Sequence, residues 1–186
     1  PLLKKIAKKK KPIFLSTGAS NIREIESAYK YISKFNKKIC LMHCTMSYPT
    51  KPEDVNLLAL NEFKKKFKNI PLGLSDHSLG YKIAAASVLL GVRVIEKHFT
   101  YNKRLKKSAN HSISIDSFEL KKLRQSVDLF LKASGEENKK VLKCEKELRK
   151  IARRSLVTTK LIKKGEFIRE NNLIPKRPGT GISPNL

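Results

Sequence analysis

The sequence contains no tryptophan, only three cysteines and no long apolar segment. Cys40, Cys44 and Cys144 form no Cys-x-x-Cys pair, and such an odd, sparse set is typical of a protein from the reducing cytosol. The longest apolar run, residues 83–90, is too short to span a bilayer, and the basic N-terminal segment lacks the apolar stretch of a signal peptide. We therefore expect a cytoplasmic protein that has no membrane partner.

Acidic residues are also scarce, with 16 Asp and Glu against 41 Lys and Arg, which gives a net charge of +25. A charge of this size is typical of proteins that bind nucleic acids or anionic surfaces. However, lysine outnumbers arginine 32 to 9, and no basic stretch is interleaved with aromatic residues. Base recognition and stacking favour arginine and aromatic side chains. We therefore expect no nucleic-acid partner, although a non-catalytic basic binding protein remains an alternative.

Short apolar runs alternate along the chain with segments of helical periodicity. The apolar runs, each ending in polar residues, are 12–18, 38–45, 71–78 and 92–100. The helical segments are 21–35, 53–67, 81–90 and 116–133. Near-continuous apolar strands separated by helices predict βα units around a parallel sheet, so the expected fold class is α/β.

Four βα units are half of an eight-stranded barrel, which needs about 250 residues, and the alternative is a small open sheet. A half barrel would expose two unpaired strand edges, which native proteins avoid, so either the sheet is open or further chain completes it. The missing initiator methionine also favours a fragment. After the charged segment 137–150, a strand-like run at 155–159 and a Gly/Pro-rich loop at 176–181 indicate the start of a small β-rich module.

Two histidines follow neighbouring apolar runs, His77 after residues 70–76 and His98 after residues 92–97. The carboxyl ends of parallel strands meet at one edge of a sheet, where α/β proteins build their sites. Two imidazoles side by side there can hold a divalent metal, whereas the simpler interpretation is two unrelated polar residues at loop starts.

Other polar strand ends are less specific. Ser16-Thr17-Gly18 is compatible with an anion-binding loop that opens a helix, but a Ser or Thr N-cap has the same sequence pattern. His43 lies inside an apolar run, which favours a hydrogen-bonded core histidine. Cys40 and Cys44 share one face of the same expected strand, which favours buried structural thiols.

Several of these segments together resemble the sialic acid synthase family. The matching segments are LSTG at 15–18, HCT at 43–45 with YP at 48–49, SDHSLG at 75–80 and VIEKHFT at 94–100. The C-terminal segments RRSLV at 153–157, IKKGE at 162–166 and KRPGTGI at 176–182 resemble the antifreeze-like (SAF) module of that family.

This resemblance implies a (β/α)8 TIM barrel followed by a β-rich SAF module of the β-clip type. Residues 1–134 would form the second half of the barrel, 135–152 a helical linker and 153–186 part of the module. The family works as a domain-swapped homodimer. The resemblance also implies that the first four strands, with the catalytic acidic residues and a phosphate-binding lysine, precede Pro1. The present chain alone is then expected to be inactive.

The implied reaction condenses phosphoenolpyruvate with an N-acetylated aminosugar such as N-acetylmannosamine. It yields a nine-carbon 2-keto sugar acid and phosphate. A divalent metal, typically Mn²⁺, is held by the histidines that match His77 and His98 and polarises the sugar aldehyde. The residues that match substrate contacts of the family are Ser16 and Ser75 at the phosphate, Tyr48 at the sugar, and Arg177, which reaches the active site of the partner subunit.

The chain departs from the family pattern at two substrate-pocket positions. Met46 stands where members commonly have Asn or Ser, and Asn110 stands where a sugar-binding Asp is common. We still expect Asn110 to contact substrate. These departures leave the acceptor sugar open, and synthases of legionaminic acid, pseudaminic acid or spore-coat sugars are related alternatives.

Overall fold

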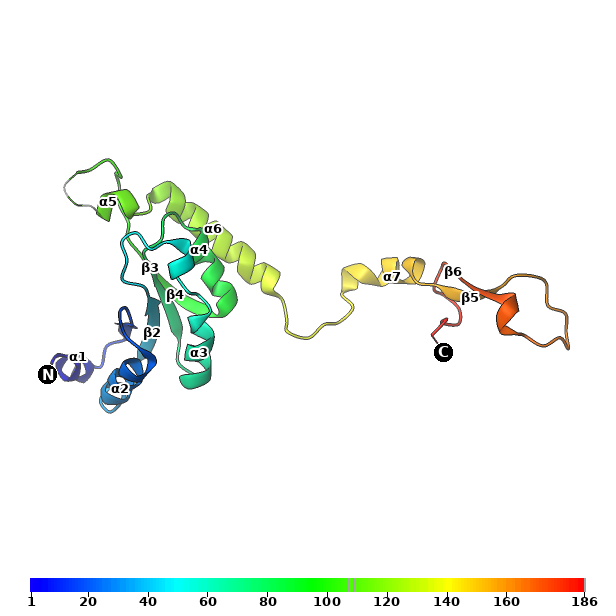
Figure 1. The fold of residues 1–186 in the computed structure, drawn as a ribbon, viewed down its shortest axis with the longest axis horizontal. Helices are drawn as coiled ribbons and strands as arrows, with labels where there is room; N and C mark the ends of the chain where they lie inside the picture. The colour runs from blue at the N-terminus through cyan, green and yellow to red at the C-terminus, as the bar shows by residue number, and fades with distance from the viewer. Residues whose placement is uncertain (107, 109, 186) are drawn as a thin grey trace. The chain divides into compact units, whose positions relative to one another are not determined.

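The structure is a computed structural model that describes residues 1–106, 108 and 110–185 (Figure 1). The chain forms two compact units, Pro1–Gly135 and Glu136–Leu186. Within the described residues, we find no helix that combines the length and the apolar character needed to cross a membrane.

The first unit contains a four-stranded sheet whose strands follow the chain order β1-β2-β3-β4 (Figure 1). All three pairings are parallel, which confirms the predicted α/β class. The strands are β1 (Ile13–Ser16), β2 (Ile39–Cys44), β3 (Leu72–Asp76) and β4 (Val92–Lys97). The register aligns Ser75 with Glu96 and Asp76 with Lys97, so the carboxyl ends of β3 and β4 lie side by side.

The helices of this unit include the four predicted segments, three of them shorter than predicted and 116–133 displaced by one residue, together with helices at 2–8 and 110–113 that the sequence did not predict. They are α1 (Leu2–Lys8), α2 (Ile22–Ser33), α3 (Ala59–Lys66), α4 (Lys82–Ala86), α5 (Asn110–Ile113) and α6 (Ser117–Ser134), with 3-10 turns at Pro52–Asp54 and Ser87–Leu90. The predicted helix 53–67 is interrupted because Asn56 adopts a left-handed backbone with a φ of 49°. The capping box of Asp116 and Glu119 starts α6 as predicted.

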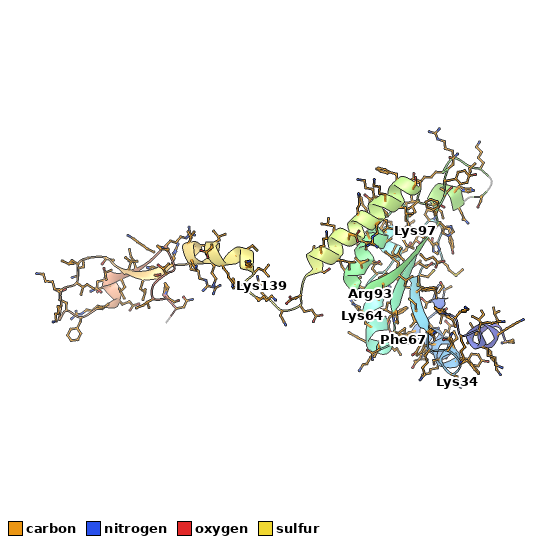
Figure 2. The ribbon with its side chains drawn as sticks, turned by 180° about the vertical axis from the view of Figure 1, so that it is seen from behind. Lys34, Lys64, Phe67, Arg93, Lys97 and Lys139 are labelled. Carbon is orange, nitrogen blue, oxygen red and sulfur yellow. The ribbon has the colours of Figure 1, made fainter. Side chains whose placement is uncertain are left out.

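One face of the sheet is covered by helices. Leu41, Leu72 and Leu74 of the sheet are buried in one cluster with residues of α2 and α3. The region of α3 shows the division clearly, since Phe63 in the helix and Phe67 directly after it are buried in this cluster while Lys64 is exposed. Figure 2 labels Lys64 and Phe67. Side chains alternate across a strand, so Gly73, Ser75 and their neighbours lie on the opposite face.

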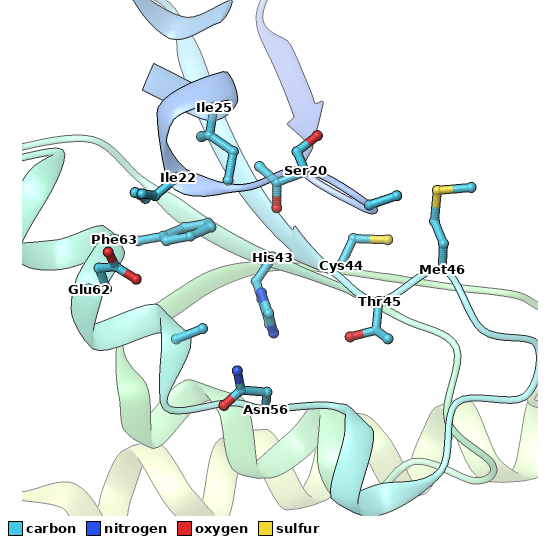
Figure 3. Close-up of a pocket in the computed structure, with 13 residues that line it drawn as sticks. Ser20, Ile22, Ile25, His43, Cys44, Thr45, Met46, Asn56, Glu62 and Phe63 are labelled. Carbon is cyan, nitrogen blue, oxygen red and sulfur yellow. The ribbon is translucent and has the colours of Figure 1, made fainter. Parts of the chain in front are cut away.

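His43 belongs to the helix-covered face, as its position inside an apolar run predicts. The ring is 8 % exposed, and its Nε2 atom lies 2.7 Å from the carbonyl oxygen of Val55. It also packs edge-on against Phe63 and lines a cavity of about 400 Å³ together with Ser20 and Glu62 (Figure 3). The hydrogen bond to the backbone confirms His43 as a structural core residue. Cys40 and Cys44 are buried on the opposite face, as predicted.

The opposite face leaves no room for a side chain at Gly73. A Cβ atom there would lie 2.1 Å from Sδ of Met42 and 3.0 Å from the carbonyl oxygen of Val94. Met42 is itself fully buried. Gly73→Ala is therefore expected to lower the free energy of unfolding by about 1–3 kcal/mol, measured by urea denaturation, because overpacking forces neighbours to shift. In a Met42→Ala background the same Gly73→Ala change should cost less, because the clashing side chain is gone, and an unchanged urea midpoint for Gly73→Ala alone would contradict the packing.

The second unit contains helix α7 (Lys146–Ala152) and the antiparallel pair of β5 (Ser155–Thr158) and β6 (Leu173–Lys176). A 3-10 turn at Lys143–Glu145 precedes the helix, and another at Glu170–Asn172 precedes β6. The Gly/Pro-rich loop after β6 is tied to the preceding helix, since the amide of Gly179 donates to the carbonyl oxygen of Lys150 at 2.8 Å. The strand predicted at 155–159 is present as β5 and is one residue shorter than predicted.

Candidate metal and substrate site

The carboxyl ends of β3 and β4 enclose a small polar cavity. It has a volume of about 190 Å³ and is lined by Ser75, His77, Glu96, Lys97 and His98. The ring centroids of His77 and His98 lie 5.3 Å apart. The structure thus brings both predicted metal ligands and the predicted phosphate contact Ser75 into one cavity.

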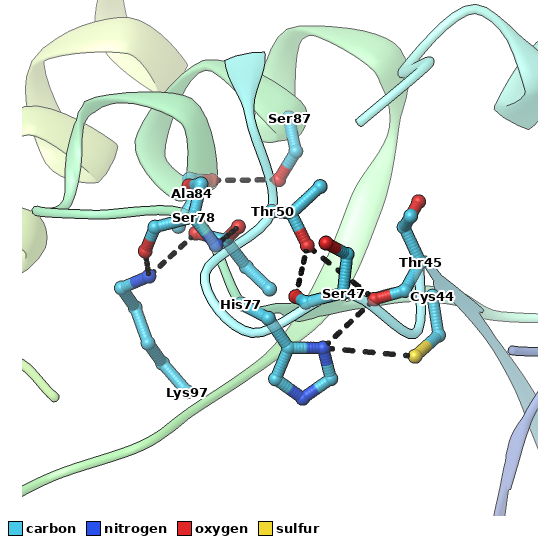
Figure 4. Close-up of polar contacts among 10 residues, drawn as sticks. Cys44, Thr45, Ser47, Thr50, His77, Ser78, Ala84, Ser87 and Lys97 are labelled. Carbon is cyan, nitrogen blue, oxygen red and sulfur yellow. Dashed lines mark hydrogen bonds and ion pairs between the residues drawn. The ribbon is translucent and has the colours of Figure 1, made fainter. Parts of the chain in front are cut away.

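The orientation of His77 is fixed by the backbone of the neighbouring strand end. Its Nδ1 atom lies 3.1 Å from the carbonyl oxygen of Thr45, and the Sγ atom of Cys44 lies 3.9 Å from the same nitrogen (Figure 4). Since a carbonyl oxygen only accepts hydrogen bonds, Nδ1 carries the proton in this contact. The neutral ring then presents the lone pair of Nε2, which is how metal-binding histidines are oriented in proteins.

The surroundings of the His98 ring favour its neutral form. Partial burial lowers its pKa, repulsion from a protonated His77 and from Lys97 lowers it further, and Glu96 acts in the opposite direction. A lowered pKa keeps the imidazole unprotonated at neutral pH, and only the unprotonated ring can bind a metal.

Tyr48 forms one wall of the histidine pair. Its ring centroid lies 4.2 Å from that of His77 and 6.0 Å from that of His98. The tyrosine is half exposed, so its ring is accessible to a bound molecule. The structure thus brings Tyr48 beside both predicted metal ligands.

The donor set suits a metal that keeps open coordination positions. Within the described part of the chain, no group of three or more His, Cys, Asp or Glu side chains is arranged to hold a metal. A divalent metal in this cavity would take two nitrogen ligands from His77 and His98, with water, substrate or other protein groups completing the coordination. The residues present fit a catalytic metal better than a closed structural one.

A buried ion pair lies directly beside the two histidines, and the sequence analysis did not anticipate it. Nζ of Lys97 lies 2.8 Å from Oδ2 of Asp76, and both side chains are almost fully buried. Nζ also donates to the carbonyl oxygen of Ser78 at 2.6 Å, and the amide of Ser78 donates to Oδ1 of Asp76 at 2.9 Å (Figure 4). The sequence does show that Asp76 and Lys97 each stand at the end of a predicted strand. That they pair with each other depends on the register of β3 and β4, which the structure supplies.

The remaining predicted site residues lie outside this cavity. Ser16 is exposed at the carboxyl end of β1, two strands away from β3 in the sheet. Asn110 is the first residue of α5, and this segment returns to β4, because the amide of Ile115 donates to the carbonyl oxygen of His98 at 2.9 Å. Arg177 lies in the second unit, where its Nε atom donates to the carbonyl oxygen of Ala152 at 2.9 Å.

The parallel sheet and the histidine pair at its strand ends define an α/β protein with a site built as in α/β enzymes. Residues 1–139 match the NeuB family, and the chain belongs to this family. This result confirms the family resemblance seen in the motifs between residues 15 and 100.

Individual relatives agree with this assignment. The chain is 46 % identical over 186 residues to N,N'-diacetyllegionaminic acid synthase of Campylobacter jejuni, covering 98 % of the chain and 55 % of that protein. It is 36 % identical over 176 residues to human N-acetylneuraminate-9-phosphate synthase, covering 95 % of the chain and 49 % of that protein. The chain spans about half the length of the curated relatives it matches.

Solved structures match as well. The N-acetylneuraminic acid (sialic acid) synthetase of Leptospira borgpetersenii superimposes with a TM-score of 0.73 and 33 % identity, covering 79 % of this chain and 51 % of that one. The spore coat polysaccharide biosynthesis protein SpsE of Bacillus subtilis gives a TM-score of 0.66 and 32 % identity, covering 98 % and 55 %.

Proposed function

We propose that this chain forms part of a synthase that condenses phosphoenolpyruvate with an N-acetylated aminosugar, giving a nine-carbon 2-keto sugar acid and phosphate. The observation that carries the proposal is the cavity that gathers His77, His98 and Ser75 at adjacent strand ends of a NeuB-family chain. Relatives named as synthases of sialic, legionaminic and pseudaminic acids support this reaction class.

The side chains of the cavity have separate roles in this proposal. His77 and His98 hold a divalent metal, Mn²⁺, which supplies Lewis-acid polarisation of the sugar aldehyde when it is bound. The Ser75 hydroxyl donates to the phosphate of phosphoenolpyruvate, and the exposed Ser16 hydroxyl reaches the same phosphate. Tyr48, packed on His77, places its ring against the sugar.

The architecture we propose is the second half of a TIM barrel followed by part of an SAF module. The strands follow the chain order and carry their covering helices on one face, which is the arrangement of a barrel segment. The alternative of a small open sheet would leave the outer edges of β1 and β4 unpaired. We propose that further chain pairs with these edges and supplies the acidic residues and the lysine of the active site.

A chimaera tests the function. The 186-residue chain alone is expected to show no phosphate release from phosphoenolpyruvate with N-acetylmannosamine and Mn²⁺. Joining it to the preceding half of the Campylobacter jejuni synthase is expected to restore Mn²⁺-dependent release, because the two sequences share 46 % identity over the part replaced. The acceptor sugar of the Campylobacter enzyme should be assayed in parallel with N-acetylmannosamine. The sugar that gives the faster phosphate release is the better acceptor for the chimaera.

The matched control is the same chimaera with His77→Ala, which should be inactive. Robust turnover by the 186-residue chain alone would contradict the proposed division of the active site. A folded chimaera that binds DNA in a salt-dependent manner and shows no turnover with either sugar would favour the non-catalytic basic binding protein.

A further inference from the structure

We propose that the buried ion pair of Asp76 and Lys97 positions His77 and His98 at the distance a metal needs. The two charged residues directly precede the two histidines, Asp76 at the end of β3 and Lys97 at the end of β4. This inference rests on the proposed metal site. It assigns a positioning role to two residues that do not themselves contact the metal.

The alternation of side chains directs the Asp76 carboxylate away from the two histidines, whereas Lys97 also lines the cavity that contains them. Successive residues of a strand point to opposite faces, so residues two apart share a face. Asp76 lies two residues after Leu74, whose side chain is in the core beneath the helices. The Asp76 carboxylate therefore lies on the helix-covered face, and His77 points to the cavity. Lys97 pairs with Asp76 in the register, so the same alternation places His98 beside His77.

The ion pair connects the two strand ends at the last point where they are paired. Beyond Asp76 and Lys97 the β3–β4 ladder ends, and the two histidines are held by different parts of the backbone. The carbonyl oxygen of His77 accepts from the amide of Thr50 at 3.0 Å, and that of His98 accepts from the amide of Ile115 at 2.9 Å. Neither of these contacts fixes one histidine relative to the other.

The contacts of Lys97 do fix that relation. Its Nζ atom binds Asp76 before His77 and the carbonyl oxygen of Ser78 after it, so it holds the backbone on both sides of this histidine (Figure 4). Lys97 is itself adjacent to His98. The ammonium group thus sets the spacing of the two segments through two charge-assisted hydrogen bonds made by almost fully buried side chains.

The test measures binding of Mn²⁺ alone, by the loss of the free-ion EPR signal, in the purified protein. Asp76→Leu combined with Lys97→Met removes both charges together and leaves no unpaired buried charge, a change that folded proteins often tolerate. The dissociation constant for Mn²⁺ is expected to rise by about 10- to 100-fold, as for other residues that orient metal ligands. Arg124→Met with Asp128→Asn removes an exposed ion pair elsewhere and is the matched control, with an expected change of less than about twofold.

Two further measurements keep a positioning role apart from loss of structure. Asp76→Asn keeps the size of the side chain and its acceptor for Ser78, and should weaken Mn²⁺ binding by a smaller factor than the double variant does. Nitrogen-15 NMR should show His77 still protonated at Nδ1 in each variant, because its bond to Thr45 does not involve the ion pair. A folded Asp76→Asn protein and a folded double variant that both bind Mn²⁺ as tightly as the parent would overturn the inference. Unchanged binding in His77→Ala and His98→Ala would instead contradict the metal site itself.

Discussion

Replacing His77 with alanine is expected to reduce bound Mn²⁺ to background and to lower turnover of the active protein by about 100-fold or more. The structure gives this residue two independent features of a metal ligand. Its ring lies 5.3 Å from that of His98, and its Nδ1 proton is directed to the carbonyl oxygen of Thr45, which leaves Nε2 for the metal. Lewis-acid polarisation is worth several kcal/mol in the transition state, which corresponds to a loss of this size.

Metal content by mass spectrometry and phosphate release from phosphoenolpyruvate together check this expectation. His43→Gln is the matched control, because His43 is a buried imidazole whose Nε2 donates to the carbonyl oxygen of Val55, and it lies outside the cavity of His77 and His98. It should change stability and leave metal content intact. Full metal content in His77→Ala would remove this residue from the coordination sphere, whatever happened to turnover.

The fold of the first unit follows from local patterns that the sequence displays openly. The four apolar runs form the four parallel strands, and they could be recognised because the segments between them have helical periodicity. Capping signals such as Asp116 with Glu119 mark where a helix begins. The interruption before α3 did not follow from periodicity, since Val55 and Leu58 fit a helix while Asn56 leaves it through a left-handed backbone. A single residue of this kind changes a helix boundary without changing the apolar pattern.

Only those site residues that directly follow a predicted strand could be predicted from the sequence. His77 and His98 were found because both follow apolar runs, and parallel strands bring such positions together. Asp76 and Lys97 follow the same rule, yet their pairing depends on a register with a shift between Leu72 and Gly73, which no single-strand pattern contains. The role expected of Arg177 could not be predicted from strand ends, because Arg177 belongs to the second unit and its expected role involves a partner subunit.

Arg177 is expected to serve the active site of a neighbouring subunit in a domain-swapped homodimer. One of its donors, Nε, is used to fix the side chain on the carbonyl oxygen of Ala152, and the exposed guanidinium keeps further N–H groups for a ligand. The loop that carries it is tied down by Ser155, whose hydroxyl donates to the carbonyl oxygen of Pro178 and accepts from the amide of Gly181, each at 2.8 Å. A guanidinium held in this way can bind sugar hydroxyls or an N-acetyl carbonyl without first losing much freedom.

A mixing experiment on the full-length protein distinguishes a role across subunits from one within a subunit. Arg177→Ala and His77→Ala are each expected to be nearly inactive alone. If Arg177 acts on the partner, a mixed dimer contains one site with both residues intact, and equal mixing with free subunit exchange should restore about a quarter of the parental activity. If Arg177 acts within its own subunit, every site in the mixed dimer lacks one of the two residues and activity stays absent. Subunit exchange must be demonstrated with differently tagged chains. No recovery after exchange would reject the cross-subunit role, because each mixed dimer pairs an intact His77 of one subunit with an intact Arg177 of the other, and a site shared across the dimer would then be active.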